Sequence, residues 1–514
     1  MMKIELPQEV KNIINALSQA GFEAYAVGGC VRDVLRGVLP EDWDVTTNAT
    51  PEQIQKIFPE SFYENVFGTV GVRTGSESKN LSVVEITTYR TEEKYSDHRH
   101  PDSIRFAKTL EEDLARRDFT INALALSSVD GAAPQIIDPF GGQKDLESGK
   151  IKSVGDPDKR FLEDALRMLR AVRFASTFGF EIDPQIFDAI RKNSASIKYI
   201  AKERIRDEIL KIISFTPKEW QDSKDDDRRY SNELDDTDVL KGPARAFILL
   251  HESGLLNFIL PELEEGMGVS QHLPHRYDVW QHTLRAFTYS VKENFPVVVR
   301  LASLFHDIAK PRAKSGQGEE STFYNHDVLG AKIAIQVLTR LRFPKDIIEK
   351  VAVLVRRHMF SYDAEITTDS SVRRLMREVG LENFGDLIKL RLADRVATPV
   401  PKAEKYALRH LKARAEILSQ DPISVTMLKI NGHEVMKALG IEPGPKVGAV
   451  LNTLLEEVLD NPKKNSQEYL SQRIRELGSM TESELMELGR QARERSRKIE
   501  EEAEKKIKEK YYVK

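Results

Sequence analysis

The 514-residue sequence has little cysteine, no long apolar run and little net charge. Its single cysteine, Cys30, excludes an internal disulfide and a cysteine-rich zinc ribbon. No run of about 18 apolar residues is present, which excludes a membrane-spanning helix. The first ten residues include Glu5 and Glu9 and lack the apolar core of a signal peptide. We therefore expect a cytoplasmic protein of a reducing compartment with no membrane partner.

Charge is nearly balanced over the chain but not within it. The sequence has 77 basic and 81 acidic residues, a formal net charge of −4, so any nucleic-acid partner must be met by a local basic surface. Residues 216–240 hold nine acidic and four basic residues, which is typical of a solvated loop or a disordered insert. Residues 331–420 hold 18 basic and 11 acidic residues, which fits either an ordinary helical surface or a phosphate-contacting face.

The hydrophobic pattern changes from mixed to helical along the chain. Phe22–Val27, Asp44–Thr46 and Leu81–Thr88 read as strands, whereas from about residue 158 the sequence is a succession of helical patterns broken by glycine and proline. At roughly 100–200 residues per domain, the length predicts about three domains. We expect an α+β protein with a small mixed head, a long all-α body and a charge-dense helical end from Thr481.

A double glycine separates a predicted strand from a predicted helix. Gly28 and Gly29 follow Phe22–Val27 and precede the helical pattern Val31–Leu35. Glycine lets a phosphate approach the backbone, and a helix N-terminus supplies free N–H groups with positive potential. Arg32, about one turn into the helix, could reach the same phosphate. A tight connection without a ligand is the alternative.

Asp42 and Asp44 lie about ten residues further on, at positions i and i+2. On a strand both carboxylates would share one face, where two like charges are costly unless a divalent cation lies between them. Oxygen ligands suit Mg²⁺. Beside a phosphate-accepting turn, the pair predicts a nucleoside-triphosphate site with two metal ions. Glu85 is the candidate third carboxylate; exposed turn aspartates and a solvent-facing strand glutamate are the alternatives.

In the helical pattern Arg160–Thr177, Asp164, Arg167 and Arg170 recur every three residues. An acidic acceptor beside fixed guanidinium donors matches cytosine and adenine, which each present an amino donor beside a ring-nitrogen acceptor. Uracil and guanine show the reverse polarity. The group therefore predicts selection of C and A over U and G, and a surface ion pair at i, i+3 is the alternative.

Six motifs occur in the order found in one known family. They are Gly28-Gly-x-Val-Arg-Asp33, Asp42-x-Asp44, Arg116-Arg-Asp-Phe-Thr-Ile-Asn-Ala123, Asp138-Pro-Phe-Gly-Gly-x-x-Asp-Leu146, Glu163-Asp-x-x-Arg167 and Glu203-Arg-Ile-x-x-Glu208. From about residue 7 to 215 the chain resembles the class II tRNA nucleotidyltransferases, the CCA-adding enzymes of bacteria and eukaryotes. The resemblance implies a polymerase-β-like palm before a helical body, and untemplated addition of C, C and A to the tRNA 3′ end from CTP and ATP.

The resemblance also implies a role for each matching residue. It places Asp42 and Asp44 on Mg²⁺ and makes Asp164 and Arg167 the readers of the base. The implied nucleotide-binding residues are Gly28, Gly29, Arg32, Arg117, Asp164, Arg167, Arg170 and Arg173. The segment Tyr89–Pro101 matches the family's flexible loop, which is linked to the final A step.

Histidines concentrate in the C-terminal half of the chain. Adjacent His306 and Asp307 on an apolar helix would be costly to bury unpaired, and a metal shared with other helices removes that cost. The predicted ligands are His282, His306, Asp307 and Asp394, with His326 and His358 available for a second ion or a substrate phosphate. Solvated or core histidines are the alternative.

This histidine pattern resembles the HD phosphohydrolases, and a subset of bacterial CCA-adding enzymes carries such a domain. The resemblance implies phosphatase and 2′,3′-cyclic phosphodiesterase activity on RNA ends. Imidazole-rich ligation favours Mn²⁺, Co²⁺ or Ni²⁺ over Mg²⁺. The lead-in at Gln271–Val279 departs from the family in being less acidic.

We therefore predict a bifunctional tRNA-maturation enzyme in five parts. They are a nucleotidyltransferase head (1–150), a nucleotide-recognising neck (151–215), an acidic insert with body helices (216–265), an HD phosphohydrolase domain (266–420) and a helical tail (421–514). Rival functions are a poly(A) polymerase, a partial CC-adding or A-adding enzyme, and an RNA-binding protein with an inactive palm. The intact Asp42/Asp44 pair and Arg117 argue against the inactive version. No protein partner is inferred.

Overall fold

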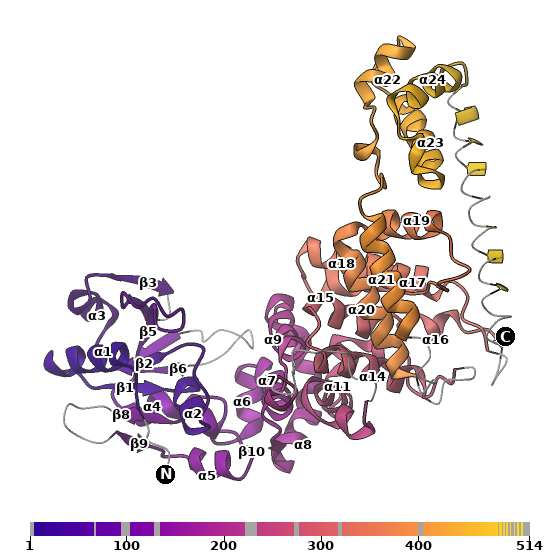
Figure 1. Ribbon diagram of the computed structural model, residues 1–514. Helices are drawn as coiled ribbons and strands as arrows, with labels where there is room; N and C mark the ends of the chain where they lie inside the picture. Colours follow the sequence, from indigo (N-terminus) through magenta and orange to yellow (C-terminus); the bar gives the residue numbers. More distant parts are fainter. Residues whose placement is uncertain are drawn as a thin grey trace. The chain divides into compact units, whose positions relative to one another are not determined.

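The chain folds into two compact units in a computed structural model (Figure 1). The structure describes residues 5–65, 68–93, 103–127, 134–221, 234–271, 277–316, 321–398, 405–481 and scattered positions up to 506. The first unit comprises Met1–Asp222, Asp235–Glu264 and Arg340–Arg342, and the second Ser223–Leu234, Glu265–Thr339 and Phe343–Lys514. Each unit is a separate body with its own candidate chemistry.

The first unit begins with a seven-stranded sheet in the order β3-β4-β5-β2-β1-β8-β9. The strands are β1 (Ala24–Val27), β2 (Asp44–Thr47), β3 (Ser61–Asn65), β4 (Thr69–Arg73), β5 (Val83–Thr88), β8 (Ala125–Ser127) and β9 (Gln135–Ile137). Only β2 and β5 pair in parallel among these neighbours; the other pairs are antiparallel. The parallel pair sets Asp44 directly opposite Glu85.

Short helices and a hairpin complete the head. They are α1 (Gln8–Gln19), α2 (Gly29–Leu35), α3 (Pro51–Ile57), α4 (Leu110–Ala115), α5 (Gly142–Glu147) and the β6 (Arg90–Glu93)–β7 (Ser103–Phe106) ribbon. In α1 the buried residues Val10, Ile13, Ile14 and Leu17 follow helical spacing and pack on the sheet core. Trp43, 2% exposed, lies in the same core, so its burial orients the carboxylates on either side of it along the chain.

In the residues that the structure describes, the rest of the first unit is helical apart from the two-residue pair β10 (Lys150–Ile151) and β11 (Glu181–Ile182). They are α6 (Pro157–Glu163), α7 (Leu166–Phe178), α8 (Pro184–Asn193), α9 (Lys202–Ser214), α10 (Lys218–Gln221), α11 (Gly242–Glu252), α12 (Leu256–Ile259) and α13 (Pro261–Glu264). The apolar positions of α7 are buried as its three-residue spacing predicts, and this helix packs against α9 and α11.

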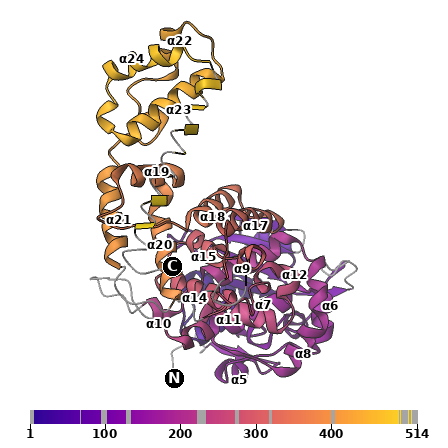
Figure 2. The same cartoon turned by 90° about the vertical axis from the view of Figure 1, so that its right-hand side faces the viewer.

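The second unit is helical in all its described elements. They are α14 (Val279–Lys292), α15 (Val297–Phe305), α16 (Lys310–Ala313), α17 (His326–Arg340), α18 (Lys345–Arg357), α19 (Asp369–Val379), α20 (Leu381–Ala397), α21 (Lys405–Leu418), α22 (Gly432–Leu439), α23 (Pro445–Asp460) and α24 (Gln467–Gly478). Helices α14, α15, α18 and α20 pack on one another, and α22, α23 and α24 gather into a bundle of their own (Figure 2). No helix in the described part of the chain is long and apolar enough to cross a membrane.

The predicted α+β class, with a mixed head before a helical body, is confirmed. The division into five parts stays a prediction, because the two compact units do not resolve it. Residues 222–233 of the acidic stretch 216–240 and residues 94–101 of the loop 89–101 lie outside the described residues.

Candidate active site and metal centre

The double glycine lies at the junction of β1 and α2, as predicted: Gly28 connects the two elements and Gly29 begins the helix. Gly28 has φ 83° and ψ −128°, a backbone conformation that side chains other than glycine rarely adopt. A Cβ at this position would lie 2.5 Å from Nη1 of Arg117. Gly28 is therefore required both by the turn and by the close approach of the Arg117 guanidinium, which lies over the turn.

Arg32 is held inside the protein. It is 9% exposed, donates to Asn122 Oδ1 at 2.6 Å and forms an ion pair with Asp33 at 2.8 Å. Its guanidinium also lies over the rings of Phe174 and Phe178, at 5.3 and 4.9 Å from their centroids. These contacts fix the direction of the guanidinium and join α2 to the helical part of the unit.

Two of the three predicted carboxylates, Asp44 and Glu85, pair on neighbouring strands, but the prediction that Asp42 and Asp44 share one strand is wrong because Asp42 lies in a bend before β2. Asp44 begins β2 beside Glu85 of β5, and Asp42 precedes it by two residues. Asp42 and Glu85 are exposed and Asp44 is half-buried, so all three can be reached from solvent. Within the described part of the chain, three or more possible metal-ligand atoms lie within 4.8 Å of one another only in the second unit, among His282, His306, Asp307, His326, His358 and Asp394. The strand register thus places Asp44 beside Glu85, and Asp42 lies two residues before Asp44 in the chain.

The prediction that Asp164 shares one helix with Arg167 and Arg170 is wrong. Asp164 has an extended backbone (φ −144°, ψ 104°) between α6 and α7. Its carboxylate accepts from the backbone N–H of Leu166 at 3.0 Å, and this local bond competes with a continuous helix. Asp164 and Arg167 each form an ion pair with another residue, Arg204 and Glu163 respectively.

The partner of Asp164 is Arg204 of α9, whose two terminal nitrogens lie 3.2 and 2.7 Å from the carboxylate oxygens. Arg167 pairs with Glu163 at 2.7 Å and donates to the Arg116 carbonyl at 3.2 Å. Arg204 and Glu163 therefore hold the two predicted base readers in fixed positions. Neither Arg204 nor Glu163 is itself predicted to contact the base.

Sequence reasoning missed a buried network centred on Asp118. This carboxylate accepts from Arg170 Nε at 2.7 Å, from Asn122 Nδ2 at 3.0 Å and from the Phe119 N–H at 2.8 Å. Burial alone would raise the pKa of Asp118, but Arg170 and the hydrogen bonds outweigh burial and hold it well below its ordinary value. The signal in the sequence is the aspartate of the motif Arg116–Ala123, which has an arginine on its N-terminal side and an asparagine four residues after it.

Glu208 of α9 was missed in the same way. It is 3% exposed and accepts from Arg173 Nε at 2.6 Å, with Arg170 Nη1 at 3.9 Å. Burial would raise its pKa, and Arg173 followed by Arg170 lowers it instead. The predicted nucleotide-binding residues Arg170 and Arg173 are thus oriented by buried carboxylates from two other elements.

In the second unit, His306 and Asp307 do not lie inside one helix as predicted. Helix α15 ends at Phe305 and α16 begins at Lys310, so both residues lie in the turn between them. The break has a local cause: Pro311 has no N–H to donate to the Asp307 carbonyl four residues before it. The turn presents both side chains toward the same buried centre.

Six side chains from five elements meet at this centre, in two groups that Asp307 joins. One group is His282, His306 and Asp394, and the other is Asp307, His326 and His358. His282 Nε2 lies 3.1 Å from both His306 Nε2 and Asp394 Oδ1. The two oxygens of Asp307 face different groups: Oδ2 lies 3.2 Å from His306 Nε2, and Oδ1 lies 3.4 Å from His326 Nε2. The prediction assigned Asp307 to the same set as His282, His306 and Asp394, with His326 and His358 as a separate pair. In the structure Asp307 groups with His326 and His358 as well.

Backbone carbonyls orient three of these imidazoles. The Nδ1 atoms of His306, His326 and His358 lie 2.9, 2.8 and 2.7 Å from the carbonyls of Ser303, Phe323 and Val355. Donation from Nδ1 leaves Nε2 as the atom that faces the centre. Carbonyl-anchored imidazoles around buried carboxylates are the arrangement in which a divalent metal is held, so the residues fit such an ion.

Protonation in the cluster is uneven. Burial would lower the pKa of His306, but the Asp307 and Asp394 carboxylates raise it to about 10. Burial, followed by the charge of His306, lowers the pKa of His358 to about 3. Lys310 Nζ pairs with Asp307 at 2.7 Å and donates to Gln271 at 2.7 Å. A metal ion bound at His306 would displace its Nε2 proton.

Comparison with known proteins identifies three regions of known families along the chain. The chain matches the models of the poly A polymerase head domain over residues 24–152, of the probable RNA- and SrmB-binding site of polymerase A over 179–216, and of the HD domain over 276–398. It is 32% identical to a CCA-adding enzyme of Lactococcus lactis subsp. cremoris, over 91% of this chain and 96% of that one. The chain belongs to the CCA-adding tRNA nucleotidyltransferase family.

Other members of this family have related names and folds. An A-adding tRNA nucleotidyltransferase of Deinococcus radiodurans is 32% identical over 84% of this chain and 91% of its own. The CCA-adding enzyme of Bacillus stearothermophilus, solved in complex with CTP, superimposes with a TM-score of 0.63 at 28% identity, over 91% of this chain and 96% of that one. The tRNA nucleotidyltransferase therefore carries a polymerase-type head and an HD domain, both of kinds that depend on divalent metals.

Proposed function

We propose that this tRNA nucleotidyltransferase adds C, C and A to the 3′ end of tRNA in the cytoplasm, using one Mg²⁺-dependent site for all three steps. In each step the terminal ribose oxygen of tRNA forms a bond to the α-phosphorus of CTP or ATP. The bond from that phosphorus to the bridging oxygen breaks, and pyrophosphate leaves. The Asp44–Glu85 pairing beside Asp42 is the observation that carries the proposal.

The residues of the head have separable roles in this proposal. Asp42, Asp44 and Glu85 hold the divalent ions, which when bound neutralise phosphate charge and lower the barrier to attack by the hydroxyl. Gly28 leaves room for the Arg117 guanidinium, which lies over the turn where the triphosphate is expected. The three carboxylates are exposed or half-buried, so a nucleotide and its ions can approach them together.

Base choice is assigned to Asp164 and Arg167. Asp164 accepts from the amino group that cytosine and adenine share, while Arg167 donates to the adjacent ring nitrogen. Arg204 holds Asp164 at 2.7 Å and Glu163 holds Arg167 at 2.7 Å, so the two readers keep a fixed spacing. A base with the opposite polarity leaves polar groups unpaired, and UTP and GTP are disfavoured.

The direct test is incubation with tRNA lacking its 3′ CCA and with each nucleotide separately and together. Incorporation of C, C and A that stops at three nucleotides supports the proposal. An enzyme that adds A only to tRNA ending in CC would instead match the Deinococcus relative, which is an A-adding enzyme. Continued addition of A would indicate a poly(A) polymerase.

We propose a second function for the six residues His282, His306, Asp307, His326, His358 and Asp394, which we call the HD cluster. This function is metal-dependent hydrolysis of phosphate esters and 2′,3′-cyclic phosphate esters. Divalent Mn²⁺, Co²⁺ or Ni²⁺ suits the imidazole-rich ligands and, when bound, supplies Lewis-acid activation of water. In the hydrolysis a water oxygen bonds to phosphorus, one ester P–O bond breaks, and the released ribose oxygen takes a proton. Release of phosphate or opening of a cyclic nucleotide, dependent on added metal and lost in His306→Ala, is the test.

A further inference from the structure

A ladder of rings lies on the second unit beside the HD cluster. The Tyr406 and His410 ring centroids are 5.8 Å apart with an interplanar angle of 36°, and those of His410 and Tyr362 are 6.0 Å apart at 31°. Tyr362 also donates or accepts at 2.6 Å with His410 Nδ1. Tyr406 is 64% exposed, so one end of the ladder presents an aromatic surface to solvent. We refer to Tyr362, His410 and Tyr406 as the ring ladder.

The ring ladder is joined to the metal cluster by the chain and by one arginine. Tyr362 follows His358, a cluster residue, by four positions, with Phe360 between them. The Arg391 guanidinium lies 5.8 Å from the Phe360 ring centroid and pairs with Asp394 at 2.7 Å. Aromatic and cationic groups therefore run from the exposed end at Tyr406 to a ligand of the cluster.

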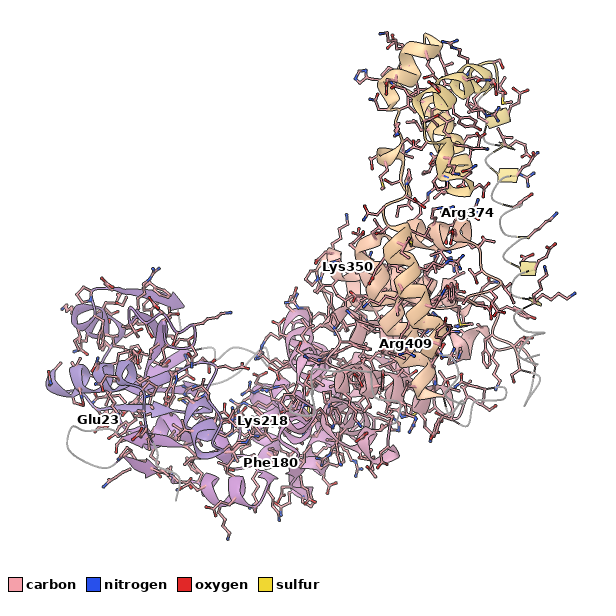
Figure 3. All side chains as sticks on the ribbon, viewed as in Figure 1. Glu23, Phe180, Lys218, Lys350, Arg374 and Arg409 are labelled. Carbon is pink, nitrogen blue, oxygen red and sulfur yellow. The ribbon has the colours of Figure 1, made fainter. Side chains whose placement is uncertain are left out.

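Positive charge accompanies the rings. Tyr406, His410 and Arg414 are spaced by four residues and share one face of α21. Arg414 donates to the Tyr362 hydroxyl at 3.4 Å and its charge is paired with Asp369 at 2.6 Å. Exposed Arg409, labelled in Figure 3, lies one turn from Tyr406 on the same helix and is the cation that a phosphate can approach. Residues 331–420 carry seven more basic than acidic residues. Rings interleaved with arginines are what an unpaired nucleic-acid strand requires, since bases stack on rings and phosphates pair with guanidiniums.

We propose that the ring ladder binds single-stranded RNA and leads its 3′-terminal phosphate to the HD cluster, which makes the substrate of that site an RNA end rather than a free mononucleotide. This inference deepens the proposed phosphohydrolase function and rests on it. RNA is favoured over a folded protein because the rings and guanidiniums lead to a cluster that is proposed to act on phosphate esters. A duplex fits less well because paired bases cannot stack on side chains.

The test uses the full chain and a short, 5′-labelled oligouridylate that ends in a 3′-phosphate, with binding followed by fluorescence anisotropy. Tyr406→Ala and His410→Ala are expected to weaken binding by at least about fivefold, and Tyr406→Phe, which keeps the ring, to leave it unchanged. Ile417→Ala is the matched control, since Ile417 is 73% exposed on the same helix and has no ring. If wild type and both ring variants bind equally well, or if Ile417→Ala loses as much binding as they do, the proposal that the ring ladder binds RNA is refuted.

A second readout separates this inference from the phosphohydrolase proposal. KM is measured for a 2′,3′-cyclic mononucleotide and for an oligonucleotide with the same cyclic end. Tyr406→Ala should raise KM only for the oligonucleotide. If both substrates are hydrolysed and neither KM changes, the ladder is refuted while the hydrolase stands; if neither is hydrolysed but the ring variants lose binding, the hydrolase is refuted while the ladder stands.

Discussion

Asp118 should be one of the side chains on which the first unit depends most. Removing its carboxylate in Asp118→Ala leaves Arg170 without the oxygen that lies 2.7 Å from its Nε, and leaves the Asn122 amide and the Phe119 N–H without their acceptor. Breaking a buried ion pair from one side costs about 3–5 kcal/mol. Because the Arg170 side chain keeps 30% exposure, solvent screens part of that loss, and we expect about 3 kcal/mol.

Cys30 supplies an assay specific to the first unit. It is the one cysteine of the sequence, 1% exposed, and burial with the nearby Asp44 charge raises its pKa to about 12. A thiol reagent should therefore react only when this unit opens. A loss of about 3 kcal/mol should speed labelling at pH 7 roughly hundredfold in Asp118→Ala. Labelling at the wild-type rate would refute the stabilising role of the network.

The matched variant Asp118→Asn separates charge from hydrogen bonding. Its amide oxygen can still accept from Asn122 and Phe119 but carries no charge opposite Arg170, so an intermediate loss is expected. The folded-state pKa of Asp118 is lowered, so its carboxylate contributes stability that is present above the unfolded pKa near 4 and is lost as pH falls toward the folded value. The difference between wild type and Asp118→Asn in urea unfolding should accordingly shrink between pH 5 and pH 2. A constant difference would contradict the assigned ionisation.

Four further outcomes are expected. Asp44→Asn should abolish incorporation of both C and A in a tRNA assay while circular dichroism stays unchanged, since one site serves both nucleotides. Arg204→Ala should release Asp164 and lower the preference for CTP over UTP by about tenfold or more in kcat/KM, with Arg204→Lys intermediate. Gly28→Ala should impair nucleotide addition by pushing Arg117 out of place, seen as a raised KM for CTP. His306→Ala should lose bound metal, measured by elemental analysis, and retain CCA addition; metal content equal to wild type would refute its role as a ligand.

The sequence predicted which residues lie in the two candidate sites better than it predicted the backbone conformation around them. The glycine turn and the histidine cluster were found because each obeys a local rule: glycine for a positive φ, and buried imidazole beside carboxylate for a metal. The rule of alternate residues on one strand face did not hold for Asp42, because β2 begins only at Asp44. Helical periodicity, by contrast, continues through Asp164 and hides the break there. That break depends on a side-chain bond to the Leu166 N–H, which a hydrophobic pattern does not record.

The partners of the predicted residues could not be read from the sequence. Arg170 meets Asp118 across 52 residues and Arg204 meets Asp164 across 40. Such pairs are set by the packing of α7 against α9 and the head, which single-chain periodicity does not specify. For Pro311 the signal was present: a proline four residues after Asp307 forbids a continuous helix, and the apolar run Leu301–Lys310 concealed it.

The two candidate metal sites differ in how far the protein alone assembles them, and charge explains the difference. In the HD cluster, carbonyl groups anchor His306, His326 and His358 from behind, and the positive charges of His306 and Lys310 offset Asp307, so ligand atoms can lie 3.1–3.7 Å apart. Asp42, Asp44 and Glu85 are all anions, and their mutual repulsion opposes convergence. A strand register can set such carboxylates side by side, but only added positive charge makes their close approach favourable. Under the proposed function, the metal–triphosphate completes the head site, whereas the fold itself sets the geometry of the HD site.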